Sequence, residues 1–138
     1  MRFWDSSALI PVILDELSSD TVRALMKDDP HIVASHLTPV ELTSSLWRRR
    51  HHGKLPAAVH LQADASFAEI TRRWSAIAAP EAVERAINLL SRHSLRAADS
   101  VQLGSALIAS ERFGSLPFVT LDLDLAGAAR AEGFTVLP

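Results

Sequence analysis

Short apolar stretches that suit buried β-strands alternate along this chain with longer stretches of helical periodicity. The strand-like stretches occupy residues 3–4, 32–34, 74–78, 118–121 and 134–137. Because helical crossovers separate them, the strands should lie parallel in one sheet with helices on both faces. The stretch at 74–78 is too brief for its periodicity to settle whether it is a strand. The alternation therefore predicts an α/β fold, a three-layer α/β/α sandwich around a central parallel sheet of four to five strands.

Composition narrows the class of protein. The 138 residues, of which 48% are hydrophobic, suffice for a single domain over residues 1–138 with its own core. No apolar run approaches the roughly 20 residues that cross a bilayer, and no leader sequence is visible, so we expect a cytoplasmic protein without membrane attachment. The absence of cysteine excludes disulfides and zinc sites with thiolate ligands. Two of the six histidines are adjacent, at positions 51 and 52, the other four are scattered, and together they form no metal-binding pattern.

Four acidic residues stand at the start of predicted helices, and two of them directly follow predicted strands. They are Asp5, Glu41, Asp99 and Asp122. Each one alone has a structural explanation. Asp5 and Asp122 suit helix N-caps, and Glu41 could complete a capping box opened by Thr38. Asp99 could favour the helix dipole or form a second box with Gln102.

Capping does not require four carboxylates to converge, but the predicted fold would bring them together. Helices that follow parallel strands begin at the carboxyl edge of the sheet, which is where ligands bind in open α/β folds. Like charges in one crevice destabilise each other and raise their pKa values. A hard divalent cation such as Mg²⁺ or Mn²⁺ relieves that repulsion and prefers carboxylate oxygens. We therefore expect a site that could activate water for phosphoryl chemistry.

Basic residues gather in one helical stretch, although the net charge of the chain is −2. They are Arg48, Arg49, Arg50, Lys54, Arg72 and Arg73. Arginines at a helix C-terminus favour the dipole, which is one explanation. A rim that guides phosphates is the other, because guanidinium groups bind phosphate through paired hydrogen bonds. If the two helices concerned form an antiparallel pair, Arg72 and Arg73 would return beside Glu41.

Two further patterns concern packing. In the helix that begins at Pro80, the residues Val83, Ile87 and Leu90 recur at helical spacing and are expected to face inward. In the most apolar helix, residues 104–106 are small and should allow close packing against the sheet.

Four stretches occur in the order that is found in PIN-domain ribonucleases. They are Trp4-Asp5-Ser6-Ser7-Ala8-Leu9, Thr38-Pro39-Val40-Glu41-Leu42, Leu95-Arg96-Ala97-Ala98-Asp99-Ser100-Val101-Gln102-Leu103 and Phe118-Val119-Thr120-Leu121-Asp122. Across essentially its whole length, the chain resembles this family, and specifically the VapC toxins of type II toxin–antitoxin modules. No single stretch is decisive, but the four in order make the resemblance strong.

The resemblance implies a PIN-like fold and a metal-dependent endoribonuclease that hydrolyses phosphodiester bonds in RNA with Mg²⁺ or Mn²⁺. It implies that Asp5, Glu41, Asp99 and Asp122 are catalytic, with Asp5, Asp99 and Asp122 binding the metal. A VapB-type antitoxin would cover the active site, and the toxin would form a homodimer. Ser6 and Thr120 fall where the family places supporting polar groups. Asp124 departs from the pattern and competes with Asp122 for the place nearer the metal.

Two other functions remain open. A PIN fold whose acidic cluster no longer cuts could still hold RNA or a protein partner. Residues 122–124 after an apolar strand also resemble the nucleophile motif of haloacid-dehalogenase-type phosphatases. That motif requires Thr or Val where this chain has Ala126, and too few residues follow to supply its remaining segments.

Overall fold

The computed structural model describes residues 1–138 apart from the side chain of Ala79. One parallel sheet runs through the molecule in the order β3-β2-β1-β4-β5. Its strands are β1 (Arg2–Trp4), β2 (Ile32–Ser35), β3 (Trp74–Ile77), β4 (Phe118–Val119) and β5 (Val136–Leu137). The predicted parallel sheet is confirmed. The stretch that the sequence left undecided, after residue 73, is a strand, β3, which brings the number of strands to five.

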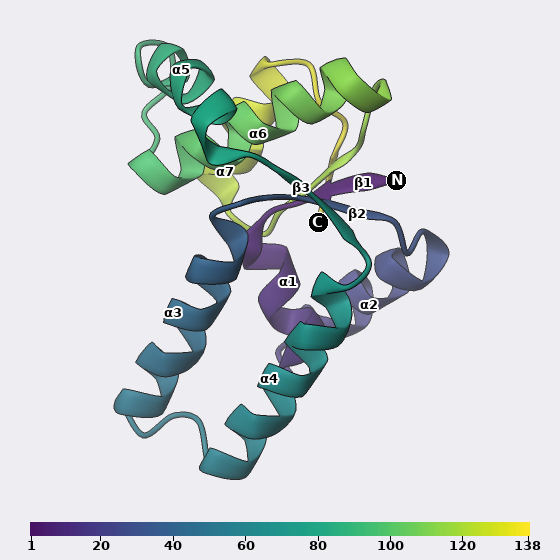
Figure 1. Ribbon diagram of the computed structural model, residues 1–138, viewed down its shortest axis with the longest axis vertical. Helices are drawn as coiled ribbons and strands as arrows, with labels where there is room; N and C mark the ends of the chain where they lie inside the picture. Colours follow the sequence, from purple (N-terminus) through teal and green to yellow (C-terminus); the bar gives the residue numbers. More distant parts are fainter.

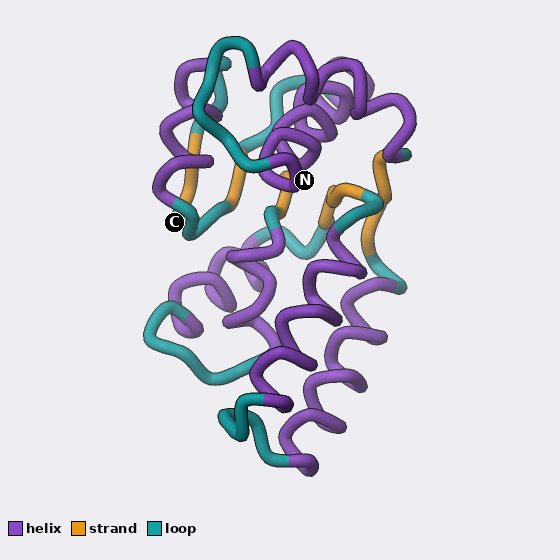
Figure 2. Tube along the Cα trace, turned by 90° about the vertical axis from the view of Figure 1, so that its left-hand side faces the viewer, coloured by secondary structure: helices purple, strands orange, loops and turns teal.

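Helices cover both faces of this sheet, as Figures 1 and 2 show. On one face lie α1 (Ser6–Ile13), α2 (Ser19–Asp28), α3 (Thr38–His51) and α4 (Ala57–Thr71). On the other lie α5 (Ala79–Leu90), α6 (Ala97–Phe113) and α7 (Leu123–Ala131). The predicted three-layer sandwich is therefore confirmed. No helix in the described part of the chain is both long and apolar enough to cross a bilayer.

The strands are short but buried on both faces. Successive side chains point to opposite sides of a strand. Phe3 and Phe118 pack into the core beneath α5, α6 and α7, with their rings stacked 5.3 Å apart. Trp4 and Val119 pack into the second core, against α1 to α4. Two-sided burial explains why so few residues suffice for each strand.

The carboxyl ends of the strands lie together at one edge of the sheet. Because every strand runs the same way, all carboxyl ends face one edge, where α1, α3 and α7 begin. The chain builds outward from β1 in both directions, with β2 on one side and β4 on the other. A crevice outside the strand ends at such a switch point is the usual ligand site of an α/β fold.

The predicted inner face of α5 is wrong. Val83, Ile87 and Leu90 are exposed at 45%, 63% and 44%, whereas Ala82, Ala86 and Leu89 are buried. The reason is the close approach of α6. A Cβ atom added at Gly104 would lie 2.9 Å from the carbonyl oxygen of Ala82, so only glycine fits there. The small residues of α6 thus serve helix–helix packing as well as the sheet, where Ser105 donates to Ser35 of β2.

The capping box expected at Thr38 does not form. Leu37 occupies the cap position of α3, and Thr38 is buried inside the first turn. Helices α3 and α4 form an antiparallel hairpin that extends beyond the sheet (Figure 1), with Gly53 at φ +68° in the turn between them.

Candidate active site

Asp5 directly follows β1 and accepts several hydrogen bonds in a buried network. It is the N-cap of α1, and its Oδ2 accepts a hydrogen bond from the backbone N–H of Ser7 at 3.1 Å. The hydroxyl of Thr120 donates to the same oxygen at 3.0 Å, and the Ser7 hydroxyl donates to it as well. Burial raises the pKa of Asp5 above its usual 3.8, although these hydrogen bonds oppose the rise. The capping explanation is therefore true, but it does not account for the depth of burial.

Glu41 lies in the first turn of α3 and contacts a residue of α6. The Gln102 side chain is fully buried, and its Nε2 donates to the Glu41 carboxylate and to the Thr38 hydroxyl. The Gln102 Oε1 has no hydrogen-bond partner. Burial raises the pKa of Glu41, and repulsion from Asp5 and Asp99 raises it further.

Asp99 and Asp122 complete the acidic group from the other side of the sheet. Asp99 is half-buried in the first turn of α6, where burial and the charges of Asp122 and Asp5 raise its pKa. Asp122 follows β4 and is the N-cap of α7, with its Oδ1 accepting the Leu125 N–H at 2.9 Å. The Thr120 hydroxyl accepts the backbone N–H of Asp122 at 3.1 Å and so ties it to the Asp5 network.

The four acids thus form one electrostatic group. Asp5 repels Glu41 and Asp99, and Asp99 is repelled in turn by Asp122. Within the described residues, however, no three acidic or histidine side chains stand close enough together to enclose a metal ion. The donor set is nevertheless suited to a hard divalent cation, because it consists of carboxylates that repel one another and whose oxygens such a cation prefers. In donor type and charge the site fits such an ion.

The supporting residues differ in part from those predicted. The Thr120 hydroxyl donates a hydrogen bond to Asp5 as expected, whereas the Ser6 hydroxyl lies 3.5 Å from Asp5 Oδ1, which is a long hydrogen bond. Ser7, which the sequence reasoning passed over, accepts the Leu121 N–H at 2.9 Å and lies 3.1 Å from the Thr120 hydroxyl. Gln102 was considered only as a partner of Asp99. A fully buried glutamine in the most apolar helix was the available signal, since such a residue requires a polar partner.

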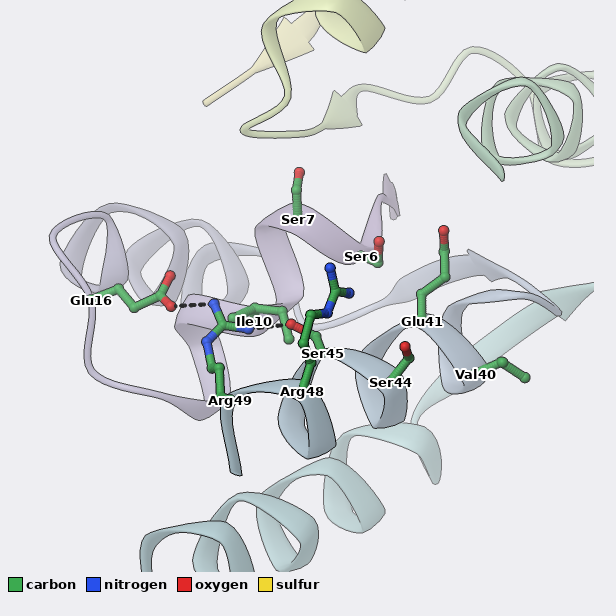
Figure 3. A pocket seen from close by; sticks show the side chains of 10 residues that line it. All are labelled: Ser6, Ser7, Ile10, Glu16, Val40, Glu41, Ser44, Ser45, Arg48 and Arg49. Carbon is green, nitrogen blue, oxygen red and sulfur yellow. Dashed lines mark hydrogen bonds and ion pairs between the residues drawn. The ribbon is translucent and has the colours of Figure 1, made fainter. Parts of the chain in front are cut away.

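A groove leads away from this acidic group along α3. It has a volume of about 460 Å³ and is lined by Ser6, Ser7 and Glu41 at one end and by Arg48 and Arg49 farther along the helix. Figure 3 shows the Arg48 side chain extending toward Ser6 and Glu41. A second cavity of about 340 Å³ shares Ser45, Arg48 and Arg49 with the first and continues to His52 and Lys54. The two cavities form one groove that begins at Glu41 and is lined by Arg48, Arg49 and Lys54 farther along.

Comparison with known proteins agrees with this arrangement. The sequence matches the PIN domain family over residues 2–131. The chain belongs to the PIN domain family. This family is part of a nuclease superfamily, so the acids lie in the kind of fold that hydrolyses nucleic acids. A search of curated proteins finds no match.

Solved structures show the same fold at low sequence identity. The crystal structure of PAE2754 from Pyrobaculum aerophilum is similar with a TM-score of 0.66 and 19% identity, covering 94% of this chain and 79% of that one. A toxin–antitoxin complex from Klebsiella pneumoniae is similar with a TM-score of 0.67 and 15% identity, covering 100% of this chain and 97% of that one.

The remaining basic residues of this PIN domain lie away from the groove. Arg50 donates to the Leu55 carbonyl. The expectation that Arg72 and Arg73 return beside Glu41 is wrong. Helix α4 leads into the start of β3, and that start pairs with Ile32 at the opposite, amino edge of the sheet. Both arginines there form ion pairs with Glu69.

The position of Asp124 also bears on the rival phosphatase reading. Asp124 lies in the first turn of α7 and is exposed, whereas Asp122 is half-buried and linked to the other acids. The two carboxylates therefore differ in burial, and Asp122 alone of the two acts on Asp99. Together with the membership of the PIN domain family, this placement removes the support for a phosphatase.

Proposed function

We propose that this PIN domain is a metal-dependent endoribonuclease of the VapC toxin type. The observation that carries the proposal is the group of four mutually repelling acids at the sheet's switch point, one of which, Glu41, lines a groove that also contains Arg48 and Arg49. An acidic centre alone would repel a phosphodiester. A cation at the centre and arginines along the approach would together make it a phosphate site.

Asp5, Asp99 and Asp122 would hold Mg²⁺ or Mn²⁺, and Glu41 would complete the catalytic group. A bound divalent ion supplies a water of lowered pKa and charge neutralisation at the reacting phosphate. Ser7 and Thr120 hold the Asp5 carboxylate in place, and Gln102 holds Glu41. These contacts fix the positions of the acids before any ligand arrives. Arg48, Arg49 and Lys54 would contact the RNA backbone, which adds affinity without reading sequence.

Two protein partners belong to the same proposal. One solved neighbour is a toxin–antitoxin complex, which supports a VapB-type antitoxin that covers the active site. A homodimer is supported by the apolar side chains of α5 and α3 that remain exposed, since such faces on a soluble protein are usually covered. They include Ile87 at 63% and Val40 at 66%.

The proposal is tested by incubating the purified protein with single-stranded RNA in Mg²⁺ or Mn²⁺ and, separately, in excess chelator. We expect endonucleolytic products only with the metal. Co-expression with the product of a neighbouring small reading frame should suppress them. Cleavage that persists in chelator would exclude the metal mechanism.

A second function rests on the spacing of the acids. Because no three of the described side chains enclose an ion, a PIN fold that holds RNA or a partner without cutting it is the alternative. It predicts that the protein binds RNA in Mg²⁺ and leaves it intact. The cleavage assay therefore distinguishes the two functions directly.

A further prediction compares Asp122 with Asp124, which compete for the place nearer the metal. We expect Asp122→Asn to reduce the cleavage rate by about tenfold or more relative to Asp124→Asn, because Asp122 faces the other acids and Asp124 lies about 200° further round the helix. Asparagine is also a good N-cap, so this substitution removes the charge and keeps the start of α7. Initial rates of RNA cleavage measure both variants. The reverse ranking would place Asp124 at the metal instead.

A further inference from the structure

The turn between α1 and α2 sends one carboxylate across to the basic groove. Glu16 lies in this turn, and its Oε1 accepts a hydrogen bond from Arg49 Nη2 at 2.7 Å. Figure 3 shows this ion pair at the end of the groove away from Glu41. Arg49 also donates to the hydroxyl of Ser45, one turn earlier on α3. The two side chains of the pair are about one-third exposed, at 36% for Glu16 and 32% for Arg49, so solvent and ligands can reach them.

The two other basic residues of the groove differ from Arg49 in their ion pairing. Among the described residues, Arg48 and Lys54 form no ion pair, although both line the groove. Arg49 alone is shared by both cavities and also neutralised by a carboxylate. A phosphate that enters between the two cavities meets Glu16 together with the arginine that should bind it.

We propose that Glu16 is a specificity-determining residue that masks Arg49 until a phosphate of a sufficiently long RNA strand displaces it. This inference rests on the proposed ribonuclease function. Arg48 would then serve any RNA that reaches the acids, whereas Arg49 would serve only strands that extend along α3. The masked pair favours extended single strands over short fragments and lone anions.

The geometry of α3 sets the length that is required. Eight residues separate Glu41 from Arg49. At about 1.5 Å per residue, this spacing is about 12 Å along the helix axis. One nucleic-acid strand advances about 3.4 Å per stacked nucleotide, so the displacing phosphate lies about three to four nucleotides from the scissile bond. A dinucleotide at the acids would not reach Glu16.

The test measures binding of the full chain to RNA in chelator, across a salt series, for wild type and Glu16→Gln. Probes are a dinucleotide and an oligonucleotide of about ten nucleotides, long enough to pass Arg49. Removing Glu16 should tighten binding of the longer probe about two- to fivefold, the factor that corresponds to one exposed ion pair. The slope of log affinity against log salt should steepen by about 0.7, as expected for one more neutralised phosphate. The dinucleotide should show neither change.

Asp15→Asn is the matched control. Asp15 precedes Glu16, loses the same charge on substitution, and pairs with Arg23 away from the groove. A general effect of net charge would appear in both variants, whereas unmasking of Arg49 appears only in Glu16→Gln. Adding Arg49→Gln to Glu16→Gln should return the slope to the wild-type value.

The outcomes separate this inference from the function beneath it. If wild type binds and cuts RNA but Glu16→Gln binds the longer probe with the same affinity as wild type, the ion pair has only a structural role. The proposal that Glu16 masks Arg49 would then be wrong. Equal gains for both probes, or for Asp15→Asn, would likewise overturn it. If wild type cuts no RNA in Mg²⁺ or Mn²⁺, the ribonuclease proposal fails and this inference fails with it. Thermal midpoints of the variants show whether folding contributes.

Discussion

Asp99→Asn should reduce RNA cleavage by about a hundredfold or more while the protein remains folded. A divalent ion contributes several kcal/mol to a phosphoryl transition state, and each 1.36 kcal/mol corresponds to about tenfold in rate. Asp99 is coupled to two of the other acids, because both Asp122 and Asp5 raise its pKa. Replacing it should therefore disturb the centre of the site rather than its edge.

The measurement is the initial rate of RNA cleavage in saturating Mg²⁺. Glu111→Gln is the matched control, because Glu111 lies on the same helix, is exposed, and pairs with Arg85 on α5 instead. Circular dichroism verifies that both variants are folded. Undiminished cleavage by folded Asp99→Asn would show that the four acids are not the catalytic group.

The sheet and its acidic edge could be predicted because local pattern and global fold agree there. Phe3 and Trp4 followed by Asp5, and residues 118–121 followed by Asp122, each combine a buried strand with a good helix cap. A parallel sheet then brings such ends together without further information. The structure adds that the acids are joined electrostatically, which no spacing in the sequence states.

Contacts between distant elements could not be predicted in the same way. Gln102 binds Glu41 across 61 residues of sequence, and Ser7 meets Thr120 across 113. Nothing local marks either pair. The prediction of the inner face of α5 was wrong for a related reason. Gly104 of α6 allows the small alanines of α5 to pack inward, which leaves the larger Ile87 exposed.

The positions of Arg72 and Arg73 could not be predicted from helix direction alone. Helices α3 and α4 do form an antiparallel pair, yet Arg72 and Arg73 lie at the opposite edge from Glu41. An antiparallel pair fixes the direction of a helix but not the edge of the sheet that it reaches. That edge follows from parallel pairing of β3 with β2, which requires α4 to end where β2 begins.

In the absence of metal, Asp99→Asn should be more stable at neutral pH than wild type. The folded protein raises the pKa of Asp99 above its usual 3.8, as it does for Asp5 and Glu41. A carboxyl with a raised folded pKa favours folding below its unfolded pKa, and this benefit is lost as the pH rises through the folded pKa. The amide carries no charge and avoids that loss. The difference between the proteins should therefore shrink as the pH falls toward about 4.

Adding Mg²⁺ should reverse the ranking, because an ion that binds only the folded state stabilises it. At about a hundred times its Kd, the ion adds about 2.7 kcal/mol to the unfolding free energy of wild type. That gain corresponds to about 5–10 °C in the thermal midpoint for a domain of this size. Asp99→Asn should gain far less, while Glu111→Gln should respond as wild type does. Thermal unfolding in chelator and in Mg²⁺, at neutral and at acid pH, measures both effects. If the variant gains as much from Mg²⁺ as wild type, Asp99 is not part of the metal site, and the repulsion among the four acids is balanced by some other means.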